Sequence, residues 1–120
     1  METVTFITTE SGDDLILSFA VQALDDLEDI ESLILMRTPK YESLLEDGER
    51  GVSASFERFD DEDDYLECVE YKKTDEIVLI KTRLHDYELD VRKVAPEELK
   101  QMGQILQKMN FDKTFKTTGI

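Results

Sequence analysis

Residues 77–94 place the strongest constraint on how this chain can fold. The stretch opens with an unbroken apolar run at residues 77–80, which is typical of a central strand covered on both faces. The pattern breaks around His85 and Asp86. Apolar and charged residues then alternate through Tyr87, Leu89 and Val91, as they do in a half-buried strand. The stretch therefore predicts a β-hairpin.

The segment that follows, residues 95–110, predicts a helix. Pro96 suits the first helical turn, and Glu97 and Glu98 suit the positive end of the helix dipole. Asn110 is a residue type that can end a helix. Apolar residues recur at three- and four-residue spacing, which indicates a face that packs on a core; they are Leu99, Met102, Ile105, Leu106 and Met109.

The beginning of the chain allows two interpretations. Val4 and Phe6 alternate with threonines, which predicts a short strand with both apolar side chains on one face. Leu15–Gln22 shows the same alternation, but it also fits a helix capped by Ser11. We favour a strand for this segment, because a turn at Gly12 after a first strand suits a hairpin.

Short apolar and acidic stretches alternate in the middle of the chain. Residues 25–31 hold five acidic side chains and predict an exposed loop or a single helical turn. Residues 33–36 predict a buried strand that ends before Pro39. Residues 60–64 are all acidic, and their mutual repulsion predicts a solvated segment without regular structure. Residues 66–72 predict a further strand.

A turn signal at Asp47-Gly48 predicts another hairpin, from residues 41–45 into a returning strand at residues 52–56. The sum is about seven or eight short, mostly hairpin-linked strands in an antiparallel sheet, with one C-terminal helix packed on it. The predicted class is therefore α+β. We expect a single domain over residues 1–120. A partly closed barrel capped by the helix is the alternative architecture.

The formal net charge is −15 and is unevenly distributed. Residues 1–70 carry 21 acidic against 4 basic side chains, whereas residues 71–120 carry 8 against 10. Such a field opposes binding to nucleic acid and to membranes with anionic lipids, and it favours a basic protein partner. Solubility alone is the simpler explanation of the acidity. No apolar run reaches the roughly 20 residues that span a bilayer, and no signal peptide is recognisable, so we expect a cytoplasmic protein.

No catalytic or cofactor-binding motif is found in the sequence, and we expect no cofactor. Cys68 falls in a predicted strand and His85 in a predicted turn, so a Cys–His pair is disfavoured. The chain lacks a Gly-x-Ser-x-Gly elbow and any phosphate-binding glycine loop. A calcium loop starting at Asp60 would need glycine where Tyr65 stands and glutamate where Tyr71 stands.

The acidic segments therefore carry the functional hypothesis, provided that hairpins bring two of them to one end of the sheet. We expect a small non-enzymatic protein-binding module, for example an immunity protein or a nucleic-acid mimic that inhibits a basic partner. The alternatives are an enzyme that uses carboxylates or a divalent metal, and a homodimeric regulatory subunit. The predicted partner-binding residues are Asp25, Asp26, Glu28, Asp29, Asp60, Asp61, Glu62, Asp63 and Asp64.

Overall fold

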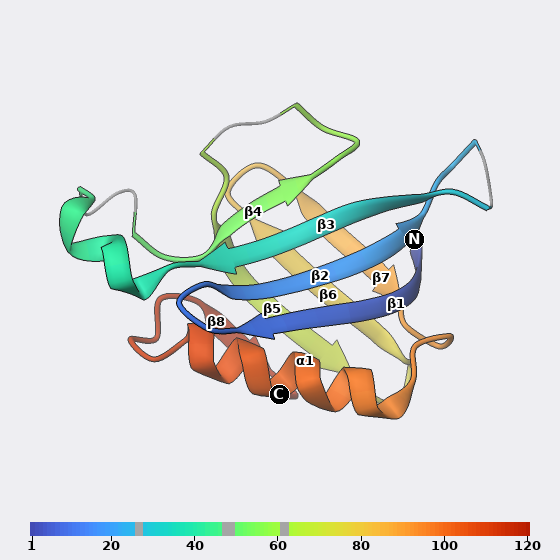
Figure 1. Ribbon diagram of the computed structural model, residues 1–120. Coiled ribbons are helices and arrows are strands. Elements are labelled where there is room, and N and C mark those ends of the chain that lie inside the picture. Colours follow the sequence, from blue (N-terminus) through green and yellow to red (C-terminus); the bar gives the residue numbers. More distant parts are fainter. Residues whose placement is uncertain (26–27, 47–49, 61–62) are drawn as a thin grey trace.

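A computed structural model describes residues 1–25, 28–46, 50–60 and 63–120. Within these ranges the chain forms one mostly antiparallel sheet and one α-helix, which confirms the α+β class (Figure 1). The strands are β1 (Glu2–Ser11), β2 (Leu15–Gln22), β3 (Ile30–Arg37), β4 (Ser53–Phe56), β5 (Leu66–Lys72), β6 (Ile77–Thr82), β7 (Asp86–Asp90) and β8 (Lys116–Thr118). The helix is α1 (Pro96–Met109), and a 3-10 helix, η1, spans Pro39–Leu44.

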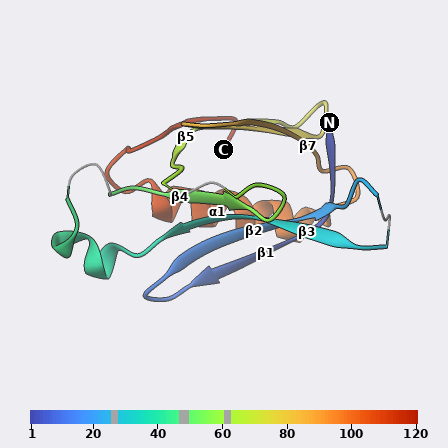
Figure 2. The same cartoon turned by 90° about the horizontal axis from the view of Figure 1, so that it is seen from above.

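The sheet is built from two halves that a short parallel pairing joins in the middle of the strand order. The strand order is β4-β3-β2-β1-β7-β6-β5-β8, and β1 pairs with β7 only at Glu2–Leu89 and Thr3–Asp90. We call β4-β3-β2-β1 the first half-sheet and β7-β6-β5-β8 the second. Seen from above, the halves form two layers, and α1 lies beneath the space between them (Figure 2). The apolar faces that the halves turn toward each other form the core.

A second contact joins the layers at the opposite edge. The Ala54 amide donates to the Asp64 carbonyl at 2.9 Å, and the Leu66 amide donates to the Val52 carbonyl at 2.8 Å. These bonds hold the start of β4 beside the chain that enters β5. The sheet thus bends toward closure, a geometry that shares features with the partly closed barrel that we considered as an alternative.

Helix α1 covers the side of the two layers that the strands leave open (Figure 1). Its buried side chains are Met102, Ile105, Leu106 and Met109, which lie on one stripe of the helix as the spacing predicts. Glu98 in its first turn accepts a hydrogen bond from the Ile7 amide at 2.6 Å, so the helix is also tied to β1.

Three local predictions are confirmed. Strand β2 has the predicted bounds, Leu15–Gln22, and buries every second side chain together with the small Ala20 on the opposite face. Strands β6 and β7 form the predicted hairpin around His85. Helix α1 begins and ends within one residue of the predicted segment.

The predicted pairing of Val4 and Phe6 on one face of β1 is wrong. The register between β1 and β2 shifts between these two residues, because β1 carries one extra residue there relative to β2. Val4 and Ile7 are consequently buried, whereas Phe6 points outward and is 43% exposed. Strand β1 continues to Ser11, so the turn to β2 contains only residues 12–14.

The predicted hairpin between residues 41–45 and 52–56 is also wrong. The chain after Pro39 forms η1, because proline fixes the backbone for a helical turn and cannot donate to a sheet. Strand β4 pairs with β3 and not with residues 41–45. The Asp47-Gly48 signal lies outside the described residues.

The apolar run of β6 was expected to be covered on both faces, but it is covered on one face only. Val78 and Ile80 are buried, whereas Leu79 is half-buried.

Candidate functional site

The first predicted acidic segment lies in the connection between β2 and β3. Asp25, Glu28 and Asp29 are exposed there, and Asp26 lies outside the described residues. The Asp29 side chain accepts the Ile30 amide at 2.9 Å, and its carbonyl accepts the Ala23 amide at 3.1 Å. Asp29 thus shapes the turn, whereas the Asp25 side chain projects from it.

The second predicted segment lies in the connection between β4 and β5. Asp60 and Asp63 are exposed, while Asp61 and Glu62 lie outside the described residues. Asp64 contradicts the expectation of a solvated segment, because it is only 3% exposed. Its carboxylate accepts the Thr82 hydroxyl at 2.7 Å and the amides of Tyr65 and Leu84. A buried carboxylate that accepts three hydrogen bonds has a structural role.

The acidic segments do not gather at one end of the sheet. The β2–β3 connection projects at one end of β3, and η1 lies at the other (Figure 1). The β4–β5 connection starts near the β2–β3 connection, since Phe56 at the end of β4 pairs with Leu33, but it then runs over the top of the molecule in that view. Arg58 further reduces the charge near the first segment, since it bonds to Glu2 at 2.7 Å and to Glu31 at 2.8 Å.

The outer face of the first half-sheet, which we call the outer face, stands out from the acidic surroundings. It is turned toward the viewer in Figure 1, and α1 lies on the opposite side. Strand pairing defines its thirteen side chains: Phe6, Thr8, Glu10, Ile16, Ser18, Ala20, Gln22, Ile30, Ser32, Ile34, Met36, Ser53 and Ser55. Only Glu10 among them is charged, and Glu57, whose amide donates to the Ser32 carbonyl at 3.1 Å, adds an acid at the edge of the face. Phe6 is 43%, Met36 40% and Ile30 39% exposed.

The second half-sheet provides an internal comparison. Its outward side chains are Cys68, Glu70, Lys72, Ile77, Leu79, Lys81, Asp86, Glu88, Asp90, Lys116 and Thr118. Seven of these eleven are charged, which is the usual condition of a sheet face in water. The outward face of the second half-sheet is therefore charged, as expected for a solvated face, and the scarcity of charged side chains is confined to the outer face of the first half-sheet.

Structural ion pairs or burial explain the displaced pKa values of the titratable groups. Asp112 bonds to Arg37 at 2.7 Å, and this bond lowers the pKa of the carboxyl. Arg92 lowers the pKa of Asp90 in the same way, through a 2.7 Å bond. Burial raises the pKa of the Tyr71 phenol. Ion pairs that hold the fold together account for such shifts without catalysis.

The described residues contain no group of three or more histidine, cysteine or acidic side chains that could hold a metal ion. His85 lies in the β6–β7 turn and stacks on Phe59, with the ring centroids 4.3 Å apart. Cys68 lies half-buried on β5 and is a free thiol. Cys68 thus lies in a strand, as its sequence context predicts, whereas His85 lies in the predicted turn but is half-buried.

Comparison with protein-family models, curated proteins and solved structures finds no match to this chain. No helix among the described residues is long and apolar enough to span a membrane. The outer face could not be recognised from the sequence, since it depends on the register shift in β1 and on the pairing of β4 with β3. A detectable signal was the scarcity of charge in β2 and β3, where serines and apolar residues dominate.

Proposed function

We propose that this chain is a binding protein for a basic protein partner, which docks on the outer face. The observation that carries the proposal is the single charge among its thirteen side chains, on a chain in which 36% of residues are charged. The centres of protein interfaces are depleted in charged residues, and a large exposed apolar patch marks an interaction site. Phe6, Ile34 and Met36 would form its apolar centre.

The charge around the outer face favours a basic partner. Acidic side chains flank the face at both ends: Asp13 lies in the β1–β2 turn, and Asp25 and Glu28 lie in the β2–β3 connection. A partner with an apolar centre and a basic rim would match this arrangement. The net charge of −15 would steer such a partner into encounter at low salt.

The size of the face suits an interface. Four strands at about 4.8 Å spacing and eight residues at about 3.3 Å each give a surface of roughly 500 Å². A stable complex buries about 800 Å² on each partner, so the flanking acidic turns would supply the remainder.

The acidity favours one particular form of this function. The chain would inhibit a nuclease or another nucleic-acid-binding protein, as an immunity protein does.

The test is an affinity capture at low and moderate salt with a matched pair of variants. The outer-face variant is Ile34→Thr/Met36→Thr, and the control is Ile77→Thr/Leu79→Thr on the second half-sheet. Threonine suits strands, so both variants should fold. We expect a basic protein to be retained by the wild type and by the control, to be lost from the outer-face variant, and to dissociate progressively as salt is added.

Two results would contradict the proposal. One is a set of captured proteins that is the same for both variants and insensitive to salt. The other is a wild-type homodimer in light scattering that becomes monomeric in the outer-face variant, since the face would then be covered by a second copy. If the captured partner is a nuclease, addition of the wild-type chain should block its activity, and the outer-face variant should fail to do so.

A further inference from the structure

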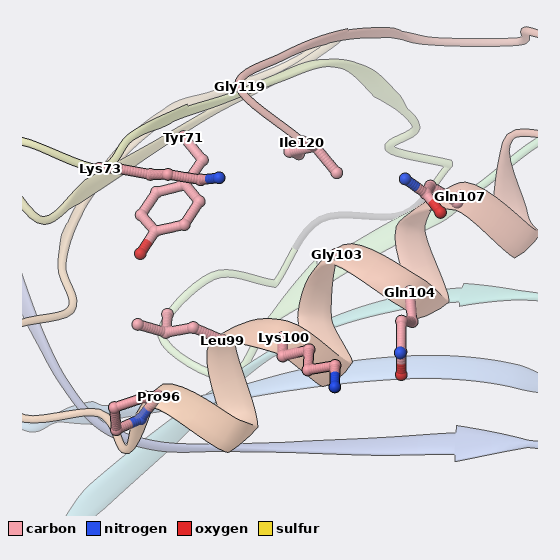
Figure 3. A pocket seen from close by; sticks show the side chains of 10 residues that line it. All are labelled: Tyr71, Lys73, Pro96, Leu99, Lys100, Gly103, Gln104, Gln107, Gly119 and Ile120. Atoms are coloured by element: carbon pink, nitrogen blue, oxygen red, sulfur yellow. The ribbon is translucent and has the colours of Figure 1, made fainter.

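A groove runs between α1 and the end of the second half-sheet, on a different part of the molecule from the outer face (Figure 3). Its volume is about 390 Å³, which lies within the range of roughly 300–1,000 Å³ found for small-molecule sites. Tyr71, Gly119 and Ile120 line it on the sheet side, and Pro96 and Leu99 line it on the helix side. Tyr71 and Ile120 point from the sheet side toward the helix, whereas Lys100 and Gln104 extend from the helix away from the sheet in this view (Figure 3).

The helix supplies one continuous wall of this groove. The lining positions recur every three or four residues, so they form a second stripe beside the one that packs on the core; they are Pro96, Leu99, Lys100, Gly103, Gln104 and Gln107. Tyr71, Leu99 and Ile120 are partly buried and pack against the core, so the floor of the groove is apolar and anchored.

Gly103 keeps the middle of the groove open. Glycine inside a helix costs about 1 kcal/mol relative to alanine. Packing does not require it here, because the nearest atom to an added Cβ would be Ile120 Cγ2 at 3.7 Å, an ordinary contact. A larger side chain at this position would fill the space between α1 and Ile120.

Two lysines give the groove a charge opposite to that of the protein. Lys73 lies on the sheet side and Lys100 on the helix side (Figure 3). Neither side chain has an ion-pair or hydrogen-bond partner within the described ranges. Gln104 and Gln107 add amide donors beside them. Lys73 and Lys100 are the charged side chains in the lining of this groove, and two basic side chains without an acidic one are unexpected on a chain of net charge −15.

We propose that this groove binds a small molecule with an apolar body and one carboxylate. The apolar body would lie on Tyr71, Leu99 and Ile120, with Gly103 beneath it. The carboxylate would lie at the open rim, where the flexible side chains of Lys73 and Lys100 can turn to reach it. The positive rim selects an anion, because an ammonium compound of the same shape would meet two like charges. The glutamine amides complete the donors for the carboxylate oxygens. The proposal is independent of the partner that docks on the outer face.

Decanoate is the probe, and its binding is followed by amide NMR shifts of the whole chain. We expect saturable shift changes centred on Gly103 and Gly119, and no comparable response to decyltrimethylammonium. Lys73→Gln/Lys100→Gln should weaken binding at least tenfold. Lys93→Gln/Lys116→Gln, which changes the net charge equally, should leave it within twofold. Gly103→Leu should abolish binding and Gly103→Ala should preserve it, although both substitutions favour the helix.

Equal affinity for decanoate and decyltrimethylammonium would overturn the proposal. Shift changes confined to the outer face, at Ile34 and Met36, would do so as well, because they would indicate unspecific binding to exposed apolar surface. An unchanged affinity in Lys73→Gln/Lys100→Gln would exclude the two lysines as the anion site. If Gly103→Leu does not fold, the comparison of the two probes on the wild type still decides the matter.

Discussion

Arg37 Nη2 donates to Asp112 Oδ2 at 2.7 Å, and this bond joins β3 to the chain just beyond α1. The guanidinium also donates to both carboxylate oxygens of Glu42 in η1, and to the Met109 carbonyl at the end of the helix. Arg37 is 3% exposed, with Phe111 over its guanidinium at 4.2 Å. One buried cation thus holds three separate segments together, and its carboxylate partners offset the cost of burying it.

Arg37→Met should destabilise the protein by about 3 kcal/mol, because Glu42 and Asp112 lose their cation and the Met109 carbonyl loses a donor. Exposure of Asp112 limits the loss, since 43% of that side chain is open to water and can be hydrated again. Urea denaturation measures the effect. Arg92→Met is the control, because the Arg92 side chain is 67% exposed, and its loss should be much smaller. If both variants lost the same free energy of unfolding, the buried Arg37 cluster would contribute no more to stability than the exposed Arg92 pair does.

The Arg37–Asp112 bond also predicts a pH dependence. The bond lowers the pKa of Asp112 in the folded state. Its stabilisation is therefore complete above the unfolded pKa, near 3.9, and is lost as the pH falls through the lower folded value. The free energy of unfolding of the wild type should exceed that of Asp112→Asn by about 1 kcal/mol at pH 7, after allowance for solvent screening.

Urea titrations of these two proteins across the pH range check this prediction. The difference should be constant above about pH 5 and shrink below about pH 4. In an Arg37→Met background the same substitution should show no such trend, which assigns the effect to this pair. A difference that grows on acidification would have the wrong sign for a lowered pKa.

Asp64 and Asp63 should behave differently although they are adjacent acids. Asp64→Ala removes the acceptor for the Thr82 hydroxyl and for two backbone amides, and should cost about 3 kcal/mol. Asp63→Asn should be nearly neutral, because Asp63 is exposed and its φ of 56° suits asparagine. Thermal denaturation compares the two variants. Equal melting temperatures would contradict the structural assignment of Asp64.

The sequence predicts β2, α1 and the β6–β7 hairpin closely, because periodicity and proline or glycine signals agree in those segments. It fails at Phe6, because a one-residue register shift moves this side chain from the inward to the outward face. The alternation of apolar and polar residues gives no sign of such a shift. Prediction from the sequence fails again at residues 41–45, where Pro39 favours a helical turn over the hairpin that Asp47-Gly48 suggests.

The candidate surfaces were harder to predict than the elements. Asp64 cannot be distinguished from Asp63 by composition, because its burial depends on Thr82 and Leu84, which are distant in the sequence. The outer face requires the pairing of four strands, and the groove requires residues from β5, α1 and the end of the chain. Long-range contacts decide both, whereas periodicity reports only which face of one element is apolar.

Gly119→Ala should detach β8 from β5. Gly119 has a φ of 77°, and an added Cβ would overlap the Tyr71 carbonyl oxygen. Because that obstacle is backbone, neither side can yield cheaply, and we expect a loss of about 2 kcal/mol. Gly12→Ala is the control, since no atom lies within 4 Å of its added Cβ. Hydrogen exchange at Val69 and Glu70, which pair with β8, should accelerate in Gly119→Ala only. Unchanged exchange there would mean that β8 does not depend on this close approach.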